Sequence, residues 1–146
     1  MGNASATLND LIELLHDGEK FYAEAAEKVK TPAYQSLFQR MARTKQAIAA
    51  DLAVHVAAHG EKASNDGTLA GTMRKAYTEV RAKLGKDAEA VYVAQLEQTE
   101  DRILEAFRDQ LSSDSSVEVR GVVERYYPEV KRAHDEMREL KHRLAA

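Results

Sequence analysis

The apolar residues of this chain recur at helical spacing over long stretches, and this feature constrains the fold more than any other. In the first stretch, Leu8, Leu15 and Tyr22 share one stripe at roughly 100° per residue. Proline occurs 2 times and glycine 7 times in 146 residues, so few positions interrupt such stripes. The pattern predicts an all-α chain in which each helix buries one face.

Five helical segments are expected from these stripes and from the residues that begin or end them. Thr7 is the expected N-cap of the first segment, and Ser115 has capping-box spacing to Glu118 at the start of the last. Pro128 lies inside the last segment, where it should kink or split the helix. The segments are expected at about residues 8–29, 33–59, 69–84, 87–111 and 116–144.

Four long segments and one short segment predict a simple topology for a single domain, residues 1–146. The first two segments form one hairpin and the last two form another. The stretch between them, with the short helix at 69–84, makes a crossover. This order is that of a ferritin-like four-helix bundle with one long connection.

Composition and the N-terminal residues exclude several classes of protein. The chain has no cysteine, which excludes disulfides, thiolate zinc sites and iron–sulfur clusters. Its net charge of −3 argues against a nucleic-acid partner. No apolar run approaches the roughly 20 residues of a membrane span, and the first residues do not have a signal-peptide pattern. We therefore expect a cytoplasmic protein with no membrane association, and no motif indicates a small-molecule substrate.

Several short motifs carry a resemblance to a known family. The first hairpin resembles that of rubrerythrin-type proteins at residues 21–28 (FYAEAAEK), 31–32 (TP) and 37–42 (LFQRMA). The whole chain resembles a bacterial ferritin-like family of four-helix-bundle proteins, with matches at residues 17–18 (DG), 67–71 (GTLAG) and 99–101 (TED). The resemblance implies a bacterial origin and a stress-linked or housekeeping role.

Ferritin-like catalysts hold two iron ions with a Glu from each of two helices and a Glu-x-x-His from each of the other two. The resemblance places those six ligand positions at Leu15, Lys45, Ile48, Glu100, Lys131 and His134. Only Glu100 and His134 keep a ligand type. A charged lysine cannot ligate, and it adds positive charge where a cation would lie. The resemblance therefore implies that the usual di-iron site is largely lost.

We interpret the remaining polar positions as a structural network that replaces the metal centre. A carboxylate in the middle of an apolar stripe needs a partner once it is buried. The predicted polar cluster consists of Glu19, Lys45, Glu100, Lys131 and His134. On this interpretation the protein is not an enzyme and needs no cofactor.

Two metal sites remain as alternatives. In the first, Glu19, Glu100 and His134 form a remodelled site for iron, manganese or zinc in a metal-binding protein or an oxidoreductase. In the second, Asp51, His55 and His59 hold a divalent metal from one helix face, at positions i, i+4 and i+8.

A third interpretation is an interaction module. A homodimer that forms through a helix face is the expected oligomer, and Tyr77 and Tyr92 are the surface positions expected to bear on it.

Overall fold

The computed structural model describes residues 3–64, 88–112 and 115–145, and this part of the chain contains helices and no strands. Its helices are α1 (Asn3–Lys28), α2 (Pro32–Ala58), α4 (Ala88–Asp109) and α5 (Val117–Ala145). The all-α prediction is therefore confirmed. The short helix expected at residues 69–84 lies outside the described residues.

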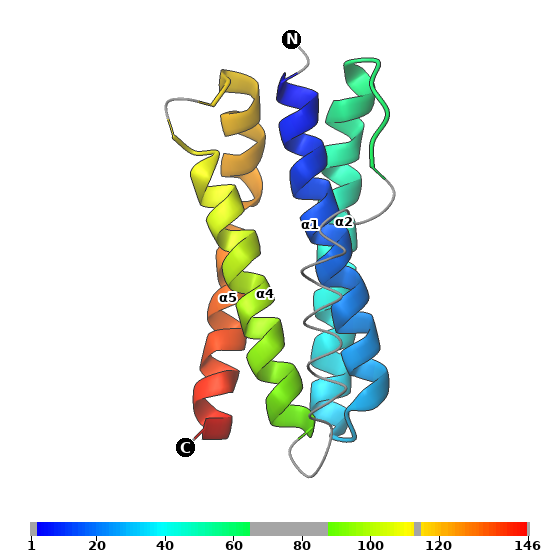
Figure 1. The fold of residues 1–146 in the computed structure, drawn as a ribbon, viewed down its shortest axis with the longest axis vertical. Helices are drawn as coiled ribbons and strands as arrows, with labels where there is room; N and C mark the ends of the chain where they lie inside the picture. The colour runs from blue at the N-terminus through cyan, green and yellow to red at the C-terminus, as the bar shows by residue number, and fades with distance from the viewer. Residues whose placement is uncertain (1–2, 65–87, 113–114, 146) are drawn as a thin grey trace.

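The helices form two hairpins that lie side by side (Figure 1). α1 runs antiparallel to α2, and α4 runs antiparallel to α5, as the stripes predicted. α2 and α4 run in the same direction. α1 contacts both α2 and α4, and this joins the hairpins.

The first helix is longer than expected at its N-terminus. α1 begins at Asn3 and not near Leu8, so Thr7 lies inside the helix and is not its N-cap. Alanine has the highest helix propensity, and the alanines at positions 4 and 6 favour the extension. Ser5 is buried, so this added turn packs against the bundle.

The turn between α1 and α2 is tied to the start of α4. Thr31 has extended backbone angles, φ −74° and ψ 117°, and precedes Pro32 at the first position of α2. The Thr31 backbone N–H and its hydroxyl each donate a hydrogen bond of 2.8 Å to the Glu89 carboxylate. These bonds hold one end of the first hairpin against the second.

The last helix begins one residue later than predicted. The Val119 N–H donates to Ser116 Oγ at 3.1 Å, which makes Ser116 the N-cap, and Ser115 instead donates to Gln110 Oε1 at 2.9 Å. The prediction of a capping box at Ser115 is wrong. Pro128 does not split the helix, since α5 continues across it.

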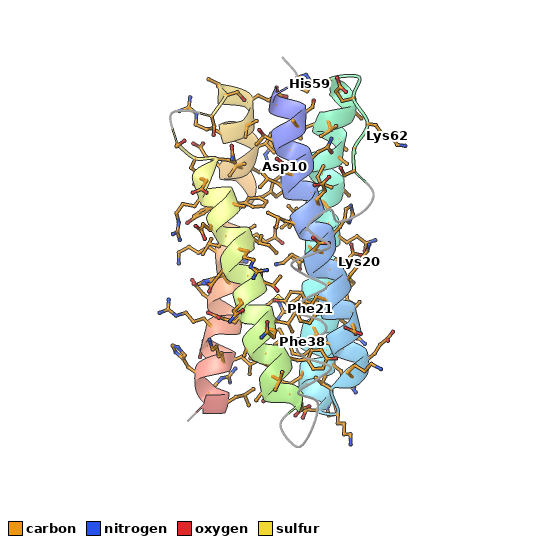
Figure 2. All side chains as sticks on the ribbon, viewed as in Figure 1. Asp10, Lys20, Phe21, Phe38, His59 and Lys62 are labelled. Atoms are coloured by element: carbon orange, nitrogen blue, oxygen red, sulfur yellow. The ribbon has the colours of Figure 1, made fainter. Side chains whose placement is uncertain are left out.

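The core consists of two apolar clusters stacked along the bundle axis. One cluster, near the turn between α1 and α2, includes Phe21 and Phe38, which Figure 2 labels. The other, toward the opposite end, includes Leu15 and Ile48. Residues 43–47 of α2 and 97–102 of α4 lie between the two clusters in sequence, so polar side chains from these stretches can form a layer in the middle of the core.

Charged residues dominate the outer surface, where large apolar side chains are few. Val54 and Val117 are 67 % and 77 % exposed. Tyr92 is wholly buried and packs edge-on against Phe21, so its expected place on the surface is wrong. Tyr77 lies outside the described residues. Within the described part of the chain, no helix combines the length and the apolar character that a membrane crossing requires.

Gly18 lets α1 approach α4 closely in the middle of the bundle. A Cβ atom added to Gly18 would lie 3.1 Å from Ile103 Cδ1 and 3.8 Å from Lys45 Cε. Gly121, in α5, has open space where its Cβ would lie. Gly18 and Gly121 therefore form a matched pair of helical positions for substitution by alanine.

We expect Gly121→Ala to raise the free energy of unfolding by about 0.5–1 kcal/mol, because alanine favours the helix. We expect Gly18→Ala to lower it, because overpacking against the buried Ile103 costs about 1–3 kcal/mol and outweighs the same propensity gain. Urea unfolding followed by circular dichroism measures both. Equal stabilisation by the two substitutions would contradict the close approach.

Candidate functional site

The middle layer of the core is built on an ion pair between Lys45 of α2 and Glu100 of α4. Both side chains are 0 % exposed. Lys45 Nζ lies 2.8 Å from Glu100 Oε1 and donates a hydrogen bond of 2.9 Å to Oε2. Oε1 faces the ammonium at close range but outside hydrogen-bond geometry, so its contact is mainly electrostatic. The ammonium therefore faces both oxygens of one carboxylate.

Tyr22 of α1 completes this layer. Its hydroxyl donates a hydrogen bond of 2.6 Å to Glu100 Oε2, and Lys45 Nζ lies 5.7 Å from the centre of its ring. Burial raises the pKa of the Tyr22 phenol well above its usual range, and the nearby Glu100 charge raises it further. The phenol therefore stays protonated at neutral pH and remains a donor to the carboxylate.

The local sequence explains why these three side chains meet. Lys45 lies four residues after Met41 and Glu100 lies four residues after Leu96, so each continues an apolar stripe into the core. Tyr22 lies four residues after Gly18, on the same face of α1, where Gly18 lies close to Ile103 of α4. We name Tyr22, Lys45 and Glu100 the core triad.

The structure brings together only two of the five residues of the predicted polar cluster. Lys45 and Glu100 meet in the core as an ion pair. Glu19 lies at the edge of the α1 stripe and is half-buried, 3.3 Å from His16 Nδ1. Lys131 is exposed and pairs with Asp135 at 2.8 Å, one turn along α5. The single five-residue cluster is therefore not what the structure shows.

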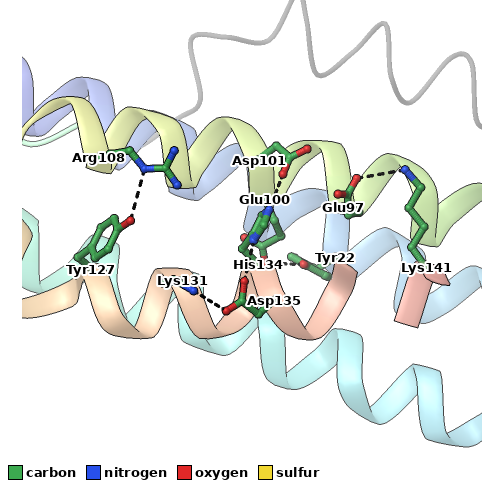
Figure 3. A network of polar contacts seen from close by, with 10 residues as sticks. All are labelled: Tyr22, Glu97, Glu100, Asp101, Arg108, Tyr127, Lys131, His134, Asp135 and Lys141. Atoms are coloured by element: carbon green, nitrogen blue, oxygen red, sulfur yellow. Dashed lines mark hydrogen bonds and ion pairs between the residues drawn. The ribbon is translucent and has the colours of Figure 1, made fainter. Parts of the chain in front are cut away.

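His134 is buried, but it faces α4 and not the core triad. Its Nε2 atom lies 2.5 Å from Asp101 Oδ1, and its Nδ1 atom lies 3.1 Å from Asp135 Oδ1 (Figure 3). The remodelled metal site of Glu19, Glu100 and His134 is therefore not assembled, because Glu19 and Glu100 have other partners.

Two residues of the second predicted metal site, Asp51 and His59, have separate partners. Asp51 accepts a hydrogen bond from the Tyr126 hydroxyl at 2.8 Å, and His59 Nε2 lies 2.7 Å from Glu118 Oε1. Positions i and i+8 of a helix are about 12 Å apart along its axis, which is too far for one ion. The geometry therefore does not support a site at Asp51, His55 and His59.

Sequence reasoning missed the one group of potential metal ligands found among residues 3–64, 88–112 and 115–145. One ligand atom from each of Glu97, Asp101 and His134 lies within 4.8 Å of the others. The spacing of the two carboxylates, four residues apart in α4, was a signal in the sequence. That His134 faces this pair depends on the rotation of α5, which the apolar pattern alone does not fix.

The core does not fit the di-iron centre that ferritin-like catalysts hold. At the six positions that the resemblance assigned, Leu15 and Ile48 are apolar and buried, and Lys131 points to Asp135. Glu100 is already paired with an ammonium. These positions lack the set of ligands that holds two iron ions, and we propose no iron chemistry there.

These features define a class: an antiparallel helical bundle with a buried ion pair in its core. The chain belongs to the family described as Domain of unknown function (DUF2383), whose profile matches residues 3–113. The match spans α1, α2 and α4, and it includes the whole core triad. α5 and His134 lie beyond it. The comparison with curated proteins gives no match.

Removing one member of the ion pair should destabilise the fold far more than removing both. Lys45→Met leaves the Glu100 carboxylate buried without a counter-charge, and we expect it to lower the free energy of unfolding by about 3–5 kcal/mol. The double variant Lys45→Met with Glu100→Gln removes both charges and keeps an acceptor for Tyr22, so it should recover most of this loss.

Urea unfolding of wild type, Lys45→Met, Glu100→Gln and the double variant gives a complete double-mutant cycle. Lys131→Met, which removes an exposed ion pair, serves as the control and should change stability by less than about 1 kcal/mol. Additive effects of the two core substitutions would contradict the coupling.

Proposed function

We propose that this protein is a non-catalytic bundle of the ferritin-like type, in which a lysine ammonium takes the place of a buried metal ion. The observation that supports this proposal is the contact of Lys45 Nζ with both oxygens of Glu100, at 2.8 and 2.9 Å, in a layer closed to solvent. The cation of this core is thus covalently part of the chain and cannot exchange.

The electrostatics of the layer support the same proposal. Glu100 carries the one carboxylate of the core triad, and its charge is balanced by Lys45. An added metal ion would face the ammonium at short range in a medium of low dielectric constant, where repulsion between like charges is strong. Lys45 also could not move away from Glu100 to make room for the metal ion, because an unpaired buried charge is costly.

The ferritin-like type rests on the chain order together with the resemblance. The two hairpins, the parallel direction of α2 and α4, and the long stretch between them are in keeping with a bundle that has one long connection. A bacterial origin, a cytoplasmic location and a stress-linked role belong to the same proposal, and they rest on the sequence alone.

Metal loading tests the proposal directly. We expect the iron content of the full chain, after anaerobic incubation with ferrous iron and desalting, to be the same in wild type and in Glu100→Gln. The reason is that Glu100 is already neutralised by Lys45. Plasma spectrometry gives the content per chain, with Glu105→Gln, an exposed position of the same helix, as the control.

About two iron ions per chain in wild type, lost in Glu100→Gln and kept in Glu105→Gln, would contradict a non-metal core. Circular dichroism of each variant before loading establishes that its bundle is folded.

We also propose that the bundle pairs with a second copy through the end at which α2 finishes and α5 begins. His59 pairs with Glu118 at 2.7 Å, which places these two helix ends together. Val54 and Val117, the two most exposed large apolar side chains among the described residues, lie near this end on the same two helices. They lie on the two helices whose ends His59 and Glu118 join, and exposed apolar side chains favour a contact between apolar surfaces.

Sedimentation velocity tests this pairing. We expect wild type to sediment with the mass of two chains and Val54→Glu with the mass of one, because a carboxylate there would be buried without a partner. Gln39→Glu adds the same charge on an exposed position toward the other end of α2 and should stay dimeric. A wild type with the mass of one chain would refute the homodimer.

A further inference from the structure

We propose that Glu97, Asp101 and His134 form a binding site for a divalent transition-metal ion, where α4 faces α5. We name these three residues the groove site. It uses neither Lys45 nor Glu100, and it is independent of the proposal that the core lacks a metal. Its expected ion is zinc, because zinc binds both imidazole nitrogen and carboxylate oxygen.

The two hairpin helices position the ligands. Glu97 and Asp101 are four residues apart in α4, so both point from one helix face toward α5. His134 of α5 faces this pair, with Nε2 at 2.5 Å from Asp101 Oδ1. The three ligand atoms lie within 4.8 Å of one another (Figure 3). Two carboxylate oxygens and one imidazole nitrogen therefore converge from two helices.

The ring of His134 is oriented as in many metal sites. Asp135 Oδ1 lies 3.1 Å from Nδ1, on the side of the ring away from Asp101. Lys131 in turn holds Asp135 with an ion pair of 2.8 Å. A carboxylate on the second ring nitrogen fixes the tautomer of a ligating histidine and turns its other nitrogen toward the ion.

Burial gives two preformed ligands and one that faces solvent. The side chains of Glu97 and His134 are 10 % and 9 % exposed, while that of Asp101 is 52 % exposed. Packing limits the rotamers of the first two, and Asp101 provides the approach from solvent. An ion held there would keep at least one position for water, as zinc sites with three protein ligands do.

The donor atoms and the charge favour zinc. Zinc accepts imidazole nitrogen and carboxylate oxygen at about 2.0–2.2 Å. The two carboxylates of the site, Glu97 and Asp101, attract a cation. Lys141 opposes this attraction, because its ammonium lies 3.4 Å from Glu97 Oε2. That separation is the longest ion-pair distance at this site, so Lys141 is the partner most readily displaced.

Zinc titration of the full chain in competition with a chelating dye tests the groove site. We expect one zinc ion per chain, with an affinity that falls at least about tenfold in His134→Gln and in Asp101→Asn. The matched controls are His142→Gln and Asp109→Asn, exposed positions two turns further along α5 and α4, and they should bind as wild type does.

Two further variants separate a designed site from a loose acidic surface. Lys141→Met should tighten zinc binding, because it removes the competing ammonium. Asp135→Asn, which leaves all three ligands in place, should weaken it by about 10–100-fold. Glu100→Gln should leave zinc affinity unchanged, so failure of the groove site and failure of the non-metal core give different results.

Equal zinc affinity in wild type, His134→Gln and Asp101→Asn would overturn the groove site. So would zinc binding that is lost in His55→Gln and kept in His134→Gln, because the ion would then lie on α2. Circular dichroism at each step establishes that the variants remain helical.

Discussion

The ion pair of Lys45 and Glu100 is the interaction on which the arrangement of the bundle depends. Two ionised side chains without solvent access are each costly to bury, and only their mutual contact and good geometry offset that cost. An apolar pair of the same volume could give equal stability. What the ion pair adds is a condition on packing: α2 and α4 must lie so that the two charges meet, and α1 must bring Tyr22 to the same point.

The requirement that the charges of Lys45 and Glu100 meet also restricts how the two apolar clusters pack. Apolar stripes tolerate a slip of one helix turn, because leucine can replace leucine in the same contact. A slip of α2 by one turn would move Lys45 into one of the apolar clusters and leave Glu100 unpaired. Gly18 strengthens the condition, since a side chain there would lie tightly against Ile103, 3.1 Å from its Cδ1 atom. The polar layer thus selects one register among several that the apolar pattern allows.

The same physics explains what the sequence could predict. Helix periodicity predicted the four long helices, and Lys45 and Glu100 were found because each interrupts an apolar stripe and so must be buried. Glu19 and Lys131 lie at stripe edges, where a small rotation of the helix decides between core and solvent. The sequence could not settle that rotation. It could not place the cap between Ser115 and Ser116 either, since both hydroxyls suit the position.

Glu100 and Asp101 are neighbours on α4, but their carboxylates face two different kinds of cation site. Glu100 and Asp101 are adjacent in sequence, and about 100° of helical rotation separates them, so one carboxylate enters the core and the other faces α5. In the core, the cation is an ammonium fixed to the chain, and it specifies packing. At the groove site, the carboxylates of Glu97 and Asp101 lie beside the imidazole of His134, and a metal ion bound there can exchange with solvent. His134 lies at the groove site and not in the core, where the resemblance to di-iron proteins placed it. Asp101 and Asp135 hold its ring there. A core closed by an ion pair and a cluster of potential metal ligands at its edge are therefore compatible in one helix pair.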